Sequence, residues 1–99
     1  MKKMHALRLF ARRWLNRREG QTYHSVEIYV DDVCVHTVPY AYGYDQAYEE
    51  TALRWLQENG YIPDLQYGNG GHEALWRYCE RKNIRYERNA ANVPRKKDL

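Results

Sequence analysis

One stretch of the chain constrains the fold most, because its apolar and polar side chains alternate with the two-residue period of a β-strand. Val26, Ile28 and Val30 are its apolar positions, and a second β-branched run follows Asp31 and Asp32. This pattern predicts a β-hairpin with a two-residue turn. The turn sets the cross-strand pairs Val30–Val33, Ile28–Val35 and Glu27–His36.

The segment before this hairpin fits two structures. As a helix it would carry an apolar stripe of Leu7, Phe10, Ala11, Trp14 and Leu15. As a strand joined to the next by a loop over residues 17–20, it would pair aliphatic residues with each other: Leu7 with Val30, Leu9 with Ile28 and Ala11 with Val26. The same register places Arg8, Phe10, Arg12 and Trp14 beside Tyr29, Glu27, Ser25 and Tyr23. A helix would sort the residues this way only by chance, so we expect a strand, with Gly20 supplying a positive φ in the loop.

Two helices and one more strand are expected after the hairpin. The first helix begins at Asp45, whose side chain suits an N-cap, and ends near Gly60. The second runs over about His72–Lys82, after a glycine-rich loop at 64–71, and alternation over Ile84–Arg88 predicts a short edge strand. The expected apolar stripes are Tyr48, Ala52, Trp55 and Leu56 in the first helix, and Leu75, Trp76 and Cys79 in the second.

These elements predict an α+β fold, an antiparallel β-meander of three strands and a short fourth, packed with two α-helices. The 99 residues suffice for one domain, which we place at residues 1–92, with a basic C-terminal tail at 93–99. No apolar run approaches the roughly 18 residues of a membrane span, and the first residues lack the hydrophobic stretch of a signal peptide. We therefore expect a cytoplasmic protein whose cysteines, Cys34 and Cys79, are reduced and mostly buried.

Charge is segregated along the chain, although the net charge is only +3. Residues 1–18 hold seven Lys or Arg and no acid, and residues 19–53 hold seven acids and no Lys or Arg. Basic residues predominate again after that. Two interpretations stay open: neighbouring segments neutralise each other in the fold, or the basic segments form a surface for a polyanion.

Aromatic residues are unusually frequent, with ten Tyr and three Trp. Several share one predicted sheet face with arginines, and single-stranded nucleic acids bind such faces because bases stack on rings while Arg neutralises phosphate. The alternative is that a helix or the C-terminal segment covers this face and makes it a second core layer. The predicted nucleic-acid-binding residues are Arg8, Phe10, Arg12, Trp14, Tyr23 and Tyr29, with Arg95, Lys96 and Lys97 from the tail.

Three parts of the chain resemble a family of short, uncharacterised proteins encoded by phages and other mobile elements. They are residues 11–24, with Ala-Arg-Arg-Trp and Gly-Gln-Thr-Tyr-His, residues 42–61, with Tyr-Gly-Tyr and Asn-Gly-Tyr, and the final Arg-Lys-Lys-Asp-Leu. The chain departs from the family at Gln21, where Asn is expected, and after Tyr44, where a second Gly is expected. The resemblance implies a phage or prophage origin and a β-meander leading into helices, but no activity. Small proteins of this kind often bind nucleic acid or disable a host defence complex.

The middle of the chain suggests a different partner. Its acidic and tyrosine-rich segments could occupy the nucleic-acid site of a host protein, because Tyr provides contact area at low entropic cost. This surface would suit a stoichiometric counter-defence inhibitor of the anti-CRISPR type that binds a host nucleoprotein complex. Packing of some of these tyrosines in the core is the alternative. The residues of this second surface are Asp31, Asp32, Tyr40, Tyr42, Tyr44, Asp45, Glu49 and Glu50.

No motif predicts catalysis. Glu27 and His36 are expected to be cross-strand neighbours, but no Ser or Cys nucleophile occurs at a recognisable spacing. The histidines are scattered without metal-ligand spacing, and the glycine-rich loop lacks the Lys-Ser/Thr of a phosphate-binding loop. We expect a non-enzymatic binding protein without metal or small-molecule cofactor, not associated with a membrane, whose outer strand could pair with a second copy.

Overall fold

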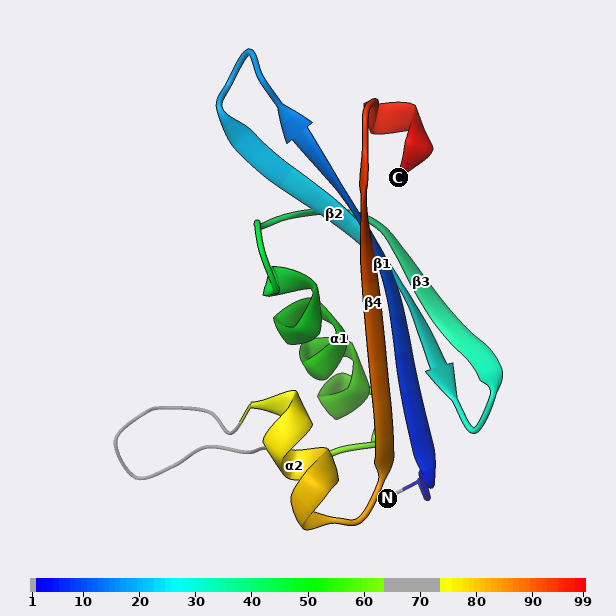
Figure 1. Ribbon diagram of the computed structural model, residues 1–99. Helices are drawn as coiled ribbons and strands as arrows, with labels where there is room; N and C mark the ends of the chain where they lie inside the picture. Colours follow the sequence, from blue (N-terminus) through cyan, green and yellow to red (C-terminus); the bar gives the residue numbers. More distant parts are fainter. Residues whose placement is uncertain (1, 64–73) are drawn as a thin grey trace.

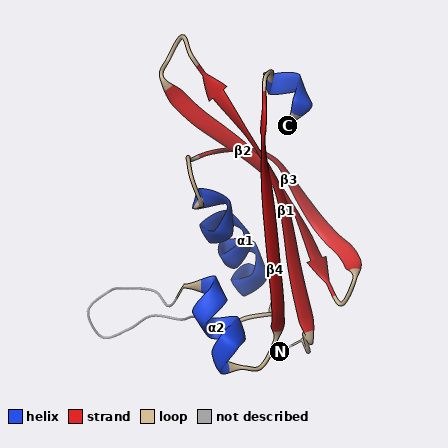
Figure 2. Ribbon diagram, viewed as in Figure 1, coloured by secondary structure: helices blue, strands red, loops and turns tan. Residues whose placement is uncertain are grey.

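The computed structural model describes residues 2–63 and 74–99. It is an α+β fold, as predicted, with a four-stranded sheet and two helices. The chain runs through β1 (Ala6–Asn16), β2 (Gln21–Val30), β3 (Val33–Tyr42), α1 (Ala47–Glu58), α2 (Leu75–Arg81), β4 (Arg85–Val93) and the short 3₁₀ helix η1 (Lys96–Asp98). Figure 2 shows the strands crossing one another with the twist expected of a sheet, and both helices on one side of it. The expected loop at 64–71 and the start of the second helix at His72 lie outside the described residues.

The strand order is β3-β2-β1-β4. The first three strands form the expected antiparallel meander, whereas β4 runs parallel to β1. It is also longer than the short strand predicted, at nine residues. The two helices carry the chain back to the end of the sheet where β1 begins, so that β4 can only enter in the same direction (Figure 1). Its place at the edge agrees with the prediction.

The pairing of β1 with β2 confirms the strand interpretation of the N-terminal segment. Leu7, Leu9 and Ala11 lie opposite Val30, Ile28 and Val26, and all six are buried. Gly20 closes the connecting turn at φ +69°, the left-handed region in which glycine carries no steric cost. Aliphatic residues at every second position thus gather on one face of the sheet.

The hairpin of β2 and β3 is partly as predicted. Val30 pairs with Val33 around a turn in which Asp31 and Asp32 both have positive φ, as a two-residue turn of this type requires. The next predicted pairs are wrong by one residue, because an irregularity between Ile28 and Tyr29 shifts the register. Ile28 consequently pairs with His36, and Glu27 with Thr37.

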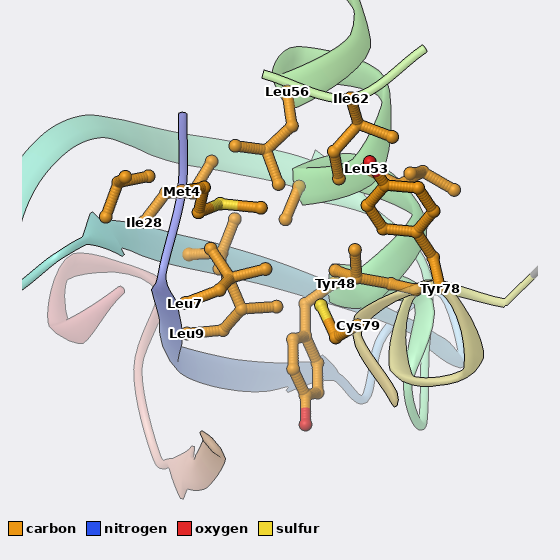
Figure 3. Packing of buried hydrophobic residues seen from close by; sticks show 14 of the residues in the cluster. Met4, Leu7, Leu9, Ile28, Tyr48, Leu53, Leu56, Ile62, Tyr78 and Cys79 are labelled. Atoms are coloured by element: carbon orange, nitrogen blue, oxygen red, sulfur yellow. The ribbon is translucent and has the colours of Figure 1, made fainter. Parts of the chain in front are cut away.

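The helices cover the aliphatic face. Helix α1 contributes Ala52 and Leu56, helix α2 contributes Leu75 and Cys79, and these side chains meet the β1 and β2 residues in one core (Figure 3). Trp76, expected in this core, is 46% exposed, and Tyr78 is buried in its place. Within the described residues, no helix has the length and apolar character needed to cross a membrane.

The start of α1 differs from the expectation. The helix begins at Ala47 with Gln46 at the N-cap, and no side chain caps it. Asp45, the predicted cap, instead has φ +56° and turns the chain before the helix. Its backbone oxygen accepts a hydrogen bond of 2.8 Å from Nη1 of Arg13. Asp45 therefore serves the turn and its contact with β1, not the helix end.

Both cysteines are free, as expected, but their environments differ. Cys79 is fully buried, and burial raises the pKa of its thiol to about 12. Cys34 lies exposed on β3, the outer strand of the hairpin, contrary to the prediction that the thiols would be mostly buried.

Candidate functional site

The face of the sheet opposite the helices, called the open face below, carries the predicted basic and aromatic residues. Strand β1 places Arg8, Phe10, Arg12 and Trp14 there, since they alternate with its buried aliphatic residues. Helices α1 and α2 lie on the other side of the sheet (Figure 1), so neither makes this face a second core layer. From β2 the open face receives the paired residues Tyr23, Glu27 and Tyr29.

One half of the open face is a network of rings and charges. The guanidinium carbon of Arg8 lies 4.7 Å from the centre of the Tyr29 ring, and that of Arg12 lies 4.9 Å from the centre of the Phe10 ring. Arg12 also forms a 3.1 Å ion pair with Glu27, which accepts a 2.6 Å hydrogen bond from the Tyr29 hydroxyl. Each of the two arginines therefore has an aromatic ring within the distance of a cation–π interaction.

The charge state of this network follows from its hydrogen bonds. The Tyr29 hydroxyl, and then Arg12, lower the pKa of Glu27 below its usual value, so this carboxylate stays ionised. The same hydrogen bond raises the pKa of Tyr29, which keeps the phenol as the donor. A shallow groove runs beside the network and is lined by Arg8, Phe10, Glu27, Tyr29 and Asn89.

The other half of the open face is a row of stacked rings. Tyr23 is its centre. Its ring centre lies 5.9 Å from that of Trp14 and 4.9 Å from that of Tyr40, both in stacked arrangements, and 5.6 Å from that of Tyr42 in an edge-to-face arrangement. The ammonium group of Lys96 lies 4.8 Å from the centre of the Tyr40 ring. Tyr40 and Tyr42 thus belong to the same surface as Trp14, whereas the sequence predicts them on the second, acidic surface.

The C-terminal residues reach this row of rings. After β4 the chain turns into η1, which lies on the side of the sheet away from α1 (Figure 1). Arg95 pairs with Asp98 at 3.2 Å, and Lys97 is exposed. Of the three basic residues predicted in the tail, Lys96 is the one that the structure brings into contact with the aromatic residues of the open face.

The predicted acidic surface is divided in the structure. One groove is lined by Tyr42, Tyr44, Asp45, Glu49 and Glu50, whereas Asp31, Asp32 and Tyr40 lie elsewhere. Asp31 and Asp32 lie in the turn between β2 and β3, at the end of the sheet opposite Tyr42 and Tyr44 (Figure 1). Asp31 accepts hydrogen bonds from the backbone N–H groups of His5 and Ala6 at 2.9 and 2.8 Å, which lower the pKa of its carboxyl. It therefore fixes the start of β1.

Glu49 is a clearer departure from the predicted surface. It is 8% exposed, pairs with Arg88 of β4, and accepts a 2.9 Å hydrogen bond from the Tyr86 hydroxyl. Burial raises the pKa of Tyr86, so this phenol remains a donor. Glu49 thus ties α1 to β4 and is largely buried, whereas its neighbour Glu50 is exposed.

The expected Glu27–His36 pair does not form. The register shift puts His36 on the helix side of the sheet. Its ring stacks there on the ring of Trp55, with 4.7 Å between the ring centres. His24 is buried, and its ring nitrogens lie 3.2 Å from the Gly43 carbonyl oxygen and 2.8 Å from the Thr51 hydroxyl. Among residues 2–63 and 74–99, no group of three His, Cys, Asp or Glu side chains could hold a metal ion.

Gly43 is required beside His24, because a Cβ there would lie 2.5 Å from the Cβ of Ala47 and 3.3 Å from the imidazole ring. The carbonyl oxygen of Gly43 can only accept a hydrogen bond, so Nδ1 carries the proton. The Thr51 hydroxyl lies 2.8 Å from Nε2 and also reaches the Ala47 carbonyl oxygen at 3.3 Å. Burial lowers the pKa of His24 and keeps the ring neutral.

This burial predicts a pH-dependent stability. Because the pKa of His24 is lower in the folded than in the unfolded state, its contribution is complete above the unfolded value of 6.5 and is lost as the pH falls toward the folded value. We expect the urea midpoint to be lower at pH 5.5 than at pH 7.5 (both about one unit from 6.5). In His24→Gln the midpoint should change much less between these pH values. Equal pH dependence in the wild-type and His24→Gln proteins would contradict this assignment.

Some residues of the open face escaped sequence reasoning. Asn89 lines its groove from β4, and Val93 pairs with Trp14 at its far end. The sequence signal for this strand is the alternation of residues after Ile84. It weakens at residues 89–92, because Asn-Ala-Ala-Asn has a low β-propensity.

Searches against protein-family models, curated proteins and solved structures find no match to this chain.

Proposed function

We propose that the protein binds single-stranded nucleic acid across its open face. The observation that carries the proposal is that α1 and α2 lie on the opposite side of the sheet, while arginines and rings alternate across the open face. The C-terminal segment reaches this face at Tyr40. In this proposal the protein binds the nucleic acid and catalyses no reaction on it.

The two arginines of β1 support this function in different ways. Arg8 is exposed and has no carboxylate within 4 Å among the described residues, so its charge can neutralise a phosphate. Arg12 shares its charge with Glu27, but its guanidinium group lies over the Phe10 ring and is half-exposed, so that a base can stack on it.

The row of stacked rings around Tyr23 supplies a second region that can contact the nucleic acid. Stacking of a base on an aromatic side chain contributes about 1–3 kcal/mol and tolerates any base. Trp14, Tyr23 and Tyr40 are already ordered by their mutual contacts, so little side-chain entropy would be lost on binding. Lys96 adds a cation at the end of the row. We expect weak sequence preference and clear salt dependence.

Fluorescence anisotropy with labelled oligo(dT) and oligo(U) tests the proposal. Affinity should fall as salt rises, and Arg8→Gln should weaken binding about tenfold at low salt, equivalent to about 1.4 kcal/mol. Arg54→Gln is the matched control, because Arg54 is an exposed arginine on α1, on the other side of the sheet. No binding at low salt, or equal losses in the two variants, would refute the proposed interface.

A second candidate retains part of the predicted acidic surface. Tyr42 and Tyr44 are 63% and 71% exposed, and they line one groove together with Asp45 and Glu50. Exposed tyrosines beside acids suit a protein partner, and the resemblance to phage-encoded proteins favours a host nucleoprotein complex in the cytoplasm. Nuclease-resistant co-purification with such a complex, lost in Tyr44→Ala, would favour this counter-defence role over nucleic-acid binding.

A further inference from the structure

The two edges of the sheet are built differently. The β3 edge contains Pro39, which has no N–H to donate, and two register irregularities distort its pairing with β2. These features discourage a further strand from adding to an edge. Strand β4 contains no proline or glycine and pairs with β1 without interruption from Arg85 to Val93. Within the described part of the chain, nothing pairs with its outer side.

The backbone groups available on that outer side can be identified. The N–H of Arg85 donates to the His5 carbonyl oxygen, so Arg85 and every second residue after it direct their backbone groups toward β1. The residues between them direct theirs outward. The four outward-directed residues are Tyr86, Arg88, Ala90 and Asn92.

We propose that β4 pairs antiparallel with β4 of a second copy of this chain, about a two-fold axis at Asn89. This register uses all four outward-directed residues, because Tyr86 then faces Asn92 of the other copy and Arg88 faces Ala90. Each such pair exchanges two backbone hydrogen bonds, giving about eight in total. The axis leaves Asn89 opposite its own copy, in a pair whose side chains approach closely.

Charge also permits this register. Arg85 faces Val93 of the second copy, Glu87 faces Ala91, and Arg88 faces Ala90, so no like charges lie directly opposite each other. Arg88 and Tyr86 are further held toward α1 by their contacts with Glu49. The chain after Val93 turns across the open face, with Lys96 at Tyr40, and so leaves the outer side of β4 clear.

The pairing has a consequence for the proposed function. In this register odd-numbered residues of one β4 face odd-numbered residues of the other, so paired side chains point to the same side of the sheet. The two copies then form one continuous eight-stranded sheet (twice the four strands of one copy), with both open faces on the same side. On this basis a dimer offers a nucleic-acid strand about twice the contact length of one copy. The pairing itself does not depend on nucleic acid, so the two proposals can fail separately.

Sedimentation equilibrium without nucleic acid tests the pairing. The wild-type chain should sediment at about twice 12.0 kDa at high concentration. Asn89→Asp and Asn89→Lys each place like charges across the axis and should weaken the dimer about tenfold or more. Mixing the two variants should restore a dimer, because the charges are then opposite. Asn92→Asp is the control and should leave the dimer intact, since it faces Tyr86.

Ala90→Pro provides an independent check, because it removes an outward N–H without breaking the hydrogen bonds to β1. This variant should stay folded by circular dichroism and sediment as a monomer. The proposal would be overturned if the wild-type chain were monomeric at all concentrations or if Ala90→Pro were a dimer. It would also be overturned if mixing Asn89→Asp with Asn89→Lys did not restore a dimer.

Discussion

Replacing Leu9 by Ala is expected to lower the free energy of unfolding by about 3 kcal/mol. Leu9 is fully buried at the middle of β1, opposite Ile28 and beneath the helices. The substitution removes apolar contacts and leaves a cavity that the sheet backbone cannot close. Since domains of this size are stable by only about 5–15 kcal/mol, the loss is a large fraction of the total.

Urea unfolding followed by circular dichroism measures this loss, and the next residue provides a matched control. Phe10 points to the open face and is half-buried, with Arg12 resting on its ring. Phe10→Ala should cost about 1 kcal/mol in stability, but it should weaken oligonucleotide binding. If Phe10→Ala destabilised the protein as much as Leu9→Ala, the assignment of the two faces would be wrong.

The second large effect is expected at the ion pair between α1 and β4. Glu49→Gln keeps the side-chain volume but removes the charge that compensates Arg88, and it weakens the acceptor of the Tyr86 hydroxyl. Breaking a buried pair costs about 3–5 kcal/mol. Because the Arg88 side chain is 36% exposed, water can solvate part of its charge. We therefore expect a smaller loss of about 2 kcal/mol.

A double-mutant cycle with Arg88→Gln separates the pair from its surroundings. The loss in the double variant should be clearly smaller than the sum of the two single losses. Glu50→Gln is the control, because Glu50 is the exposed neighbour of Glu49 and should change stability by no more than about 0.5 kcal/mol. Additive single losses would show that Glu49 and Arg88 do not stabilise each other.

The sheet could be predicted from sequence where two strands constrain each other. The sequence of β1 alone fits a helix or a strand. Aligning it with β2 pairs aliphatic residues with each other, and this match predicts both the strand and the pairs Leu9–Ile28 and Phe10–Glu27. The register beyond Tyr29 could not be predicted in this way, because a bulge adds a residue without changing local composition.

The candidate site was predictable to a similar extent. Four positions of β1 were correctly placed on one face, whereas Tyr40 and Tyr42 were assigned to another surface because only the fold brings them beside Tyr23. Glu49 illustrates the opposite error. An acid in the first turn of a helix is usually exposed, and its burial depends on Arg88 from a strand far along the chain.

The parallel placement of β4 has a consequence for the order of folding. The meander of β1, β2 and β3 can form through local contacts, but Ala6 can meet Arg85 only after residue 85 has been synthesised. Until then β1 has a bare edge in the middle of the future sheet, with its backbone groups open to any extended segment. A nascent chain of this protein therefore depends on β4 for protection from misassembly.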